Sequence, residues 1–185
     1  MKVCVVAEFY PRVTDPVLGV WAHRQALAAR DAGAEVEVVV LHRPVPPAGS
    51  LRDAGAWRRA LGEPRRRELD GLHVTTVRYA SPQRARSYGR WGAYAAPPLA
   101  VALRRLRRRF AFDLVHAHNA VPAADAVLRA GVRAPLVVSV HGGDVLWTAR
   151  QRPAWRAVVE RAYGAARLVL ANSAGTERLA REHGA

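Results

Sequence analysis

Residues 1–41 are MKVCVVAEFYPRVTDPVLGVWAHRQALAARDAGAEVEVVVL, and this stretch decides the fold class. Val3–Ala7 is a continuous apolar run that predicts a buried strand, and Glu35–Leu41 predicts a second strand. Between them, Leu18–Ala32 predicts a helix that ends at Gly33. A strand, a helix and a strand joined by short connections form a right-handed crossover between parallel strands.

The same alternation continues along the chain. Further strands are predicted at Leu72–Val77, Asp113–Ala117, Leu136–Val140 and Arg167–Ala171. Further helices are predicted at Leu99–Phe110, Ala123–Ala130, Pro153–Ala166 and Ala174–His183. This pattern indicates an α/β fold that is Rossmann-like and doubly wound, with a mostly parallel sheet of about six or seven strands and helices on both faces.

Composition restricts the class of protein. The chain has 185 residues, of which 50% are hydrophobic, and this length suits a single domain over residues 1–185. The apolar content excludes a disordered chain, and the lone cysteine, Cys4, excludes a disulfide framework. No apolar stretch approaches the ~20 residues that cross a membrane, and the start lacks a signal-peptide pattern. We therefore expect a cytoplasmic protein.

The positive charge is concentrated in one part of the chain. The formal net charge is +14, and Lys2 is the only lysine. Residues 50–112 contain 15 arginines and four acidic residues, a net charge of +11. Apart from the strand at 72–77, prolines and glycines interrupt residues 42–95, so we expect a basic surface excursion with a short helix near Trp57. Such a surface attracts nucleic acid, phospholipid or phosphorylated substrates.

The predicted helix Leu99–Phe110 is amphipathic. Its apolar stripe consists of Leu99, Leu103, Leu106 and Phe110. Its other side carries Arg104, Arg105, Arg107, Arg108 and Arg109. We expect the stripe to pack on the sheet, whereas the arginines either form a solvated face or contact an anionic membrane surface.

The candidate site lies where the predicted strands end, because ligands of open α/β sheets bind beyond the carboxyl ends of the strands. The residues that follow these ends are Glu8, Tyr10, Asp15, Gly19, His118, Asn119, His141, Gly142, Gly143, Asp144, Asn172 and Ser173. Gly19 either binds an anion at a helix start or merely permits a tight turn. No G-x-G-x-x-G motif follows the first strand, so a dinucleotide fingerprint is absent.

The segment His141–Asp144, with the sequence HGGD, is the most informative candidate. A histidine that closes a buried strand can donate, accept or act as a general base near neutral pH. Gly142 and Gly143 let a ligand approach the backbone closely. Asp144 either accepts hydrogen bonds from hydroxyls or caps the following turn. If His141–Asp144 were only a tight turn without a binding role, a histidine would not be needed at its start.

A metal site is a competing interpretation of the histidines. His116 and His118 are two residues apart and share a face of a strand, and with His141 and Asp144 they offer a set of zinc ligands. His116 lies inside an apolar strand, which favours a core histidine with a hydrogen-bonded partner. His118 lies at the strand tip, where it either binds a ligand or braces the loop.

The order and spacing of these segments resemble glycosyltransferase family 4, whose members have the GT-B fold. In the second half, the resemblance rests on Asp113–His118, on Pro135 with the strand that ends in His141–Asp144, and on Ala166–Ser173. At the start, it rests on Phe9–Pro11, Pro16–Trp21, His23–Gln25 and Gly33–Val36, which resemble the group that builds bacterial cell-surface polysaccharides. The resemblance covers nearly the whole chain, apart from the basic stretch at 42–95.

The resemblance implies a function and a set of site residues. The chain would be the N-terminal, acceptor-side domain of a retaining hexosyltransferase that moves a sugar from a nucleotide-sugar donor to a glycan or lipid-linked acceptor. The implied catalytic residues are His141, which contacts the transferred sugar, and Asp144. By position, the resemblance also places Gly19 near the donor diphosphate. The further candidate substrate-binding residues come from the strand ends and are His118, Asn119, Gly142, Gly143, Asn172 and Ser173. The nucleotide-sugar is a co-substrate, and no cofactor or metal is implied.

The chain departs from the family pattern at two places. Leu18 stands where many members have a first glycine, which weakens the diphosphate inference. The family's C-terminal domain holds the donor through a Glu-x7-Glu pattern, and no two glutamates here have that spacing. We therefore expect the C-terminal domain to be supplied in cis or in trans, and this chain alone to transfer little sugar.

An alternative function is a non-catalytic basic module. The charge of residues 50–112 would bind anionic membranes or, without sequence preference, nucleic acid. Specific nucleic-acid recognition is not expected, because no recognition module or interleaved aromatic pattern appears. Family members that act on lipid-linked acceptors often dock on anionic membranes through this domain, so the resemblance also implies a peripheral position at the inner face of the cell membrane.

Overall fold

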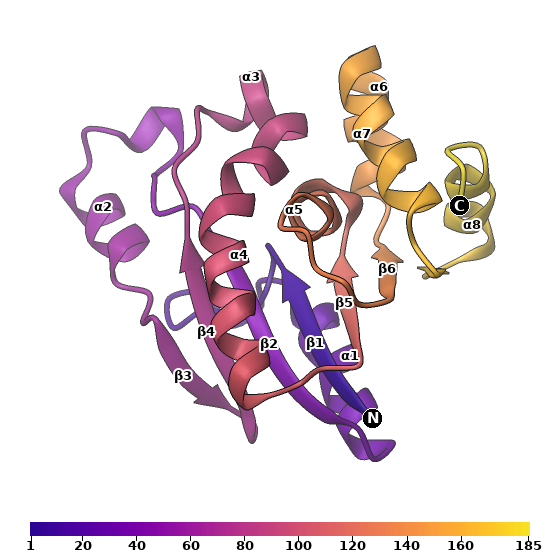
Figure 1. The fold of residues 1–185 in the computed structure, drawn as a ribbon. Coiled ribbons are helices and arrows are strands. Elements are labelled where there is room, and N and C mark those ends of the chain that lie inside the picture. The colour runs from indigo at the N-terminus through magenta and orange to yellow at the C-terminus, as the bar shows by residue number, and fades with distance from the viewer.

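Seven strands form one sheet in the order β3-β4-β2-β1-β5-β6-β7 in the computed structural model, which describes residues 1–185 (Figure 1). The strands are β1 (Lys2–Ala7), β2 (Glu35–His42), β3 (Arg66–Leu69), β4 (Leu72–Arg78), β5 (Leu114–His118), β6 (Leu136–Val140) and β7 (Leu168–Ala171). Every neighbouring pair is parallel except β3 with β4. The predicted Rossmann-like, mostly parallel sheet is therefore confirmed.

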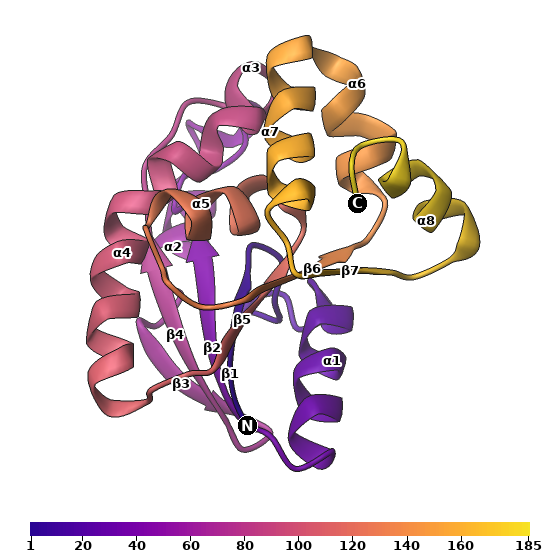
Figure 2. The same cartoon turned by 45° about the vertical axis from the view of Figure 1, so that its right-hand side comes forward.

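Helices cover both faces of the sheet. They are α1 (Val20–Asp31), α2 (Ala54–Leu61), α3 (Arg84–Ser87), α4 (Trp91–Arg109), α5 (Asp125–Arg129), α6 (Ala149–Gln151), α7 (Pro153–Gly164) and α8 (Ala174–Arg181). α1 lies on one face, and α4, α5 and α7 lie on the other (Figure 2). Alternate residues of a strand point to opposite faces, so Val5 belongs to the core of 11 buried residues under α1, and Cys4 and Val6 belong to the opposite core of 33.

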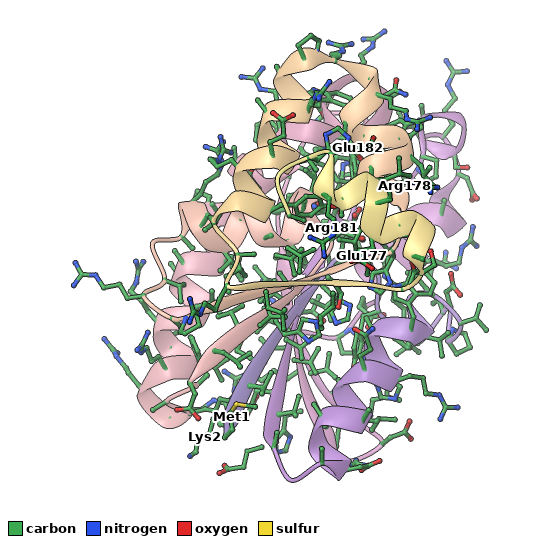
Figure 3. All side chains as sticks on the ribbon, turned by 90° about the vertical axis from the view of Figure 1, so that its right-hand side faces the viewer. Met1, Lys2, Glu177, Arg178, Arg181 and Glu182 are labelled. Atoms are coloured by element: carbon green, nitrogen blue, oxygen red, sulfur yellow. The ribbon has the colours of Figure 1, made fainter.

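The parallel strands give the sheet an amino edge and a carboxyl edge. Figure 3 shows Met1 and Lys2 at the amino end of β1, and α8 lies farther toward the carboxyl ends. On the exposed side of α8, Arg181 Nη2 pairs with Glu177 Oε1 at 2.8 Å. The two edges matter because they separate the candidate site from the arginine-rich end of α4.

The basic excursion contains one strand that the sequence analysis did not predict. The strand β3 runs antiparallel to β4 and adds the seventh strand at the sheet edge. Its turn is Asp70-Gly71, with φ of 49° and 78°, which is the conformation that a two-residue hairpin requires. The Asp-Gly pair is the local hairpin signal, but the arginines around it do not alternate with apolar residues.

The part of the 42–95 excursion that follows β4, Ser81–Gly92, was expected to be irregular like the rest, and this expectation is wrong. It contains α3, a short 3-10 turn at Tyr88–Arg90 and the beginning of α4, and it buries Tyr88 and Trp91. α4 begins eight residues before the predicted Leu99 and runs through two prolines. Packing of its first turns against the core outweighs the low helix propensity of proline.

The apolar stripe of α4 packs on the sheet, as predicted. Leu99, Leu103, Leu106 and Phe110 are all buried. Arg104, Arg105, Arg107, Arg108 and Arg109 are exposed. No helix combines the length and the apolar composition that crossing a membrane requires.

Candidate functional site

A pocket of about 380 Å³ lies at the carboxyl edge of the sheet, beyond β1, β5 and β6. Its lining residues are Phe9, Leu18, Trp21, Arg84, Tyr88, Asn119, His141, Gly143, Asp144, Trp147 and Thr148. We call it the strand-end pocket. These strands are neighbours, so the residues that follow each of them meet at this edge, as expected for a parallel sheet.

Gly19 brings the start of α1 against the end of β1. Its φ is +64°, and a Cβ atom at this position would lie 2.1 Å from the carbonyl carbon of Phe9. Only glycine permits both this backbone conformation and this approach. The first turn of α1 therefore places the ring of Trp21 with its centroid 5.7 Å from that of His141.

The loop that carries Gly19 is braced by the basic excursion. Glu63 Oε2 accepts a hydrogen bond from the backbone N–H of Val13 at 3.2 Å, and Arg67 donates to the carbonyl of Pro11. Glu63 is itself buried and pairs with Arg67 at 3.3 Å. The excursion thus has a structural role at the site, which its charge and its prolines did not reveal.

The three histidines lie next to one another, with 4.6 Å between the ring centroids of His116 and His118. His118 is 1% exposed, and its Nδ1 lies 3.0 Å from Nε2 of His141, with the two rings stacked. His116 Nε2 lies 2.8 Å from Oγ of Ser139, so its interpretation as a core histidine with a hydrogen-bonded partner is confirmed. No group of three or more His, Cys, Asp or Glu side chains is arranged to hold a metal ion.

His118 lies behind His141 and does not line the strand-end pocket. Burial lowers the pKa of both residues, so both rings are neutral near pH 7. Nε2 of His118 is buried without a partner, and a buried N–H without an acceptor is rarer than an unused lone pair. This favours the proton on Nδ1 of His118, so that Nε2 of His141 accepts and His141 carries its own proton on Nδ1.

Asp144 lines the pocket, but its carboxyl group already holds the loop after β5. The residue is 1% exposed, and its oxygens accept from the backbone N–H groups of Ala120 at 2.6 Å and Val121 at 3.3 Å. Burial raises its pKa to about 7. The contact keeps the loop from β5 close to the loop from β6.

The remaining predicted residues divide into two groups. Asn119 lines the pocket and is buried, and its Oδ1 has no hydrogen-bond partner within the protein. Gly143 also lines the pocket, and Gly142 has a φ of +94° that glycine accommodates. In contrast, Asn172 and Ser173 are exposed beyond β7 and do not line the pocket, and Ser173 caps α8 by accepting from the N–H of Thr176 at 3.1 Å.

The family model of Glycosyltransferase Family 4 matches residues 18–185. The chain belongs to this family. No curated protein is similar enough in sequence to count as a match.

Solved structures similar to this family 4 domain share its fold at low sequence identity. Sucrose-phosphate synthase from Thermosynechococcus elongatus aligns with a TM-score of 0.68 and 12% identity, over 98% of this chain and 45% of the synthase. UGT89C1 from Arabidopsis thaliana, in a complex with UDP, aligns with a TM-score of 0.50 and 12% identity, over 94% of this chain and 45% of that one. The chain therefore spans less than half the length of these glycosyltransferase structures.

The family 4 domain also brings residues to the pocket that the sequence analysis missed. Arg84 and Tyr88 come from the stretch that was expected to be irregular, and Trp147 follows the HGGD segment. Glu8, directly after β1, accepts from the Tyr88 hydroxyl at 2.7 Å and from Nη1 of Arg84 at 3.2 Å. No local pattern distinguishes Arg84 from the other arginines, because its partner lies 76 residues away.

The arginine-rich end of α4 lies away from this pocket. Arg109 pairs with Glu37 near the amino end of β2, and Arg107 donates to the carbonyl of Arg133 just before β6. Figure 1 shows this end of α4 at the edge opposite the carboxyl ends of the strands. The predicted membrane-contact residues and the predicted substrate-binding residues thus occupy opposite edges of the domain.

Proposed function

We propose that this chain is the acceptor-side domain of a retaining glycosyltransferase that moves a sugar from a nucleotide-sugar donor to a glycan or lipid-linked acceptor. The observation that carries the proposal is the strand-end pocket, which is lined by Leu18 of the Gly19 turn together with Asn119 and His141. Family membership supplies the reaction class, and the pocket supplies a place for the sugars.

The pocket has the chemistry that a sugar requires. Trp21 and Trp147 are 42% and 37% exposed, and they offer flat apolar surfaces beside polar groups. The unpartnered Oδ1 of Asn119 can accept from a hydroxyl, and neutral His141 can donate from Nδ1 to an oxygen of the transferred sugar. Asp144 and His118 act through the groups they hold, because Asp144 fixes the loop after β5 and His118 orients His141.

The donor is proposed to lie between this domain and a second, C-terminal domain supplied in cis or in trans. The first turn of α1 contains no acidic side chain, and the N–H groups of Gly19 and Trp21 have no backbone partner, so these two N–H groups can face the donor diphosphate. UGT89C1, a structural neighbour, is solved with UDP, which supports a nucleotide-sugar as co-substrate here. The sugar-binding carboxylates that this chain lacks belong to the second domain in this proposal.

Amide NMR of the 185-residue chain tests the site assignment. Titration with UDP-glucose is expected to shift the amides of Gly19, Asn119 and Gly143 and to leave those of Asn172 and Ser173 nearly unchanged. His141→Ala is expected to weaken binding, whereas His73→Ala, which removes an exposed histidine on β4, serves as the matched control. Shifts confined to α8 or to the β3–β4 hairpin would show that the pocket is not the site.

A second proposed function is docking on an anionic membrane, which would place the protein in the cytoplasm at the inner face of the cell membrane. It rests on the exposed arginines of α4 and on a groove of about 530 Å³ between α4 and β4. Arg65, Arg66, Arg105 and Arg109 surround this groove, which has apolar lining residues such as Val101. This docking would leave the strand-end pocket facing away from the bilayer, so a lipid-linked acceptor would have to reach it on an extended glycan.

Vesicle flotation tests the docking proposal. The protein is expected to float with phosphatidylglycerol vesicles and not with phosphatidylcholine vesicles, and Arg104→Gln combined with Arg105→Gln and Arg108→Gln should abolish flotation. Retention on duplex DNA at two salt concentrations provides the comparison with nucleic acid. Equal flotation of the wild type and the triple variant would contradict a role for α4.

A further inference from the structure

Arg84 is the only lysine or arginine that lines the strand-end pocket. It lies at the beginning of α3, and its side chain is 44% exposed. Its guanidinium carbon lies 3.6 Å from the ring centroid of Tyr88, and its Nη1 lies 3.2 Å from Oε1 of Glu8. A cation is therefore held at a fixed place in the wall of a pocket that also contains aromatic and polar side chains and one carboxyl group, Asp144, whose oxygens accept from backbone N–H groups.

The hydrogen-bonding capacity of Arg84 is largely unused. A guanidinium has five N–H donors, and only the one toward Glu8 has a partner within the protein. The rings of Phe9, Trp91 and Trp147 lie with their centroids 5.4, 5.7 and 6.0 Å from the guanidinium carbon. These rings restrict the orientation of the guanidinium group and leave its N–H groups free to donate. The free N–H groups lie in one plane, which matches the geometry of a carboxylate or a phosphate.

The carboxyl group of Glu8 is shared between Arg84 and Tyr88. The single hydroxyl hydrogen of Tyr88 faces two acceptors, which are Glu8 Oε2 at 2.7 Å and the carbonyl oxygen of Val121 at 3.0 Å. Glu8 thus pairs with Arg84 through one oxygen, Oε1, while its other oxygen accepts from Tyr88, and the remaining N–H groups of Arg84 stay free. Burial raises the pKa of Glu8, and the positive charge of Arg84 opposes this rise.

We propose that the acceptor is anionic, and that Arg84 binds a carboxylate or phosphate group of the acceptor sugar in the strand-end pocket. Trp21 and Trp147 flank the same space and receive the neighbouring sugar rings. This inference rests on the proposed function of the pocket as the acceptor-side site. It assigns to Arg84 the selection of charged over neutral acceptors.

Binding of matched sugars to the 185-residue chain tests the inference, with the amides of Asn119 and Gly143 as reporters in NMR titrations. The probes are methyl glucoside, methyl glucuronide and glucose 1-phosphate. We expect at least one anionic sugar to bind about tenfold or more tightly than methyl glucoside, because charge-assisted hydrogen bonds are about twice as strong as neutral ones. The glucuronide and the phosphate arms distinguish a uronic-acid acceptor from a glycosyl-phosphate acceptor.

The variant Arg84→Gln is expected to remove the preference for the anionic sugar, measured as the ratio of its affinity to that of methyl glucoside in the same variant. The matched control is Arg86→Gln, on the same helix, where the arginine is exposed and has no ion pair. Arg84→Gln leaves Glu8 buried without its cation, which destabilises the fold. The double variant Arg84→Gln with Glu8→Gln removes both charges, and it tests the same loss of preference without an unpaired buried carboxylate.

Several results would overturn the inference. Equal binding of neutral and anionic sugars by the wild type would do so, as would a preference that survives Arg84→Gln or disappears in Arg86→Gln. An Arg84-dependent gain seen for UDP but for neither anionic sugar would assign Arg84 to the donor. Failure of every sugar to perturb the pocket would overturn the proposed function as well, whereas binding of methyl glucoside alone would leave that function standing.

Discussion

Replacing Gly19 by alanine is expected to destabilise the domain and to open the strand-end pocket. Two effects act at this position. The φ of +64° is unfavourable for any residue with a Cβ atom, at a cost of about 1–2 kcal/mol. The new Cβ atom would also lie 2.1 Å from the Phe9 carbonyl carbon, so the backbone must move apart by more than an ångström. Displacement of this kind costs a further ~1–3 kcal/mol.

The expected loss in the free energy of unfolding is therefore about 2–5 kcal/mol, a large part of the ~5–15 kcal/mol that a domain of this kind possesses. Gly131→Ala is the matched control. Gly131 has a φ of +68°, but nothing lies within 4 Å of the position where its Cβ atom would be placed. It therefore reports the conformational cost without the overlap, and the difference between the two variants measures the overlap alone.

Denaturant unfolding of both variants gives the two free energies. In addition, amide NMR of Gly19→Ala is expected to show changed shifts at Trp21 and His141, because the start of α1 must move away from the end of β1. A loss for Gly19→Ala within ~0.5 kcal/mol of that for Gly131→Ala would refute the close approach as the reason for this glycine.

Three further predictions concern side chains around the sheet. His118→Phe is expected to remove the fixed tautomer of His141, which ring-nitrogen chemical shifts report, so a wild-type tautomer in the variant would contradict the assignment. Burial raises the pKa of Asp144 from 3.8 to about 7, so the folded state binds its proton more tightly. The free energy of unfolding should therefore fall by the order of 4 kcal/mol as pH rises from about 4 through 7, and Asp144→Asn should flatten this slope in pH-dependent unfolding. Arg109→Gln leaves the buried glutamate of β2 without its cation and should cost ~1–3 kcal/mol, whereas Arg108→Gln should change stability by less than ~0.5 kcal/mol.

The sequence alone predicts the central sheet well, because each strand is marked by local composition. The run at Val3–Ala7 is apolar throughout, and Ser139 is the one polar residue in Leu136–Val140, as expected for strands buried on both faces. The edge strand β3 was missed for the opposite reason. It is short and rich in arginine, and its stability comes from pairing with β4 after the Asp70-Gly71 turn.

The candidate site shows the same division. The strand-end rule identifies Gly19, Asn119 and His141 from the order of the strands along the chain, because parallel strands deliver their carboxyl ends to a common edge. It also selects Ser173, which the structure uses as a helix cap outside the pocket. Arg84 could not be selected in this way, because its position depends on contacts with Glu8 and Tyr88 that are set by the folding of α3 over the sheet.

The amino-acid sequence by itself thus determines the layers of this domain, the parallel sheet and the edge at which ligands bind, since each follows from periodicity and short connections. The tertiary structure alone decides which side chains reach that edge and in what state. Packing pairs the buried His118 with His141, brings the buried Asp144 carboxyl group to two backbone N–H groups, and places the partly exposed side chain of Arg84 against aromatic rings. These properties depend on distance and desolvation between residues far apart in the chain, which no local pattern encodes.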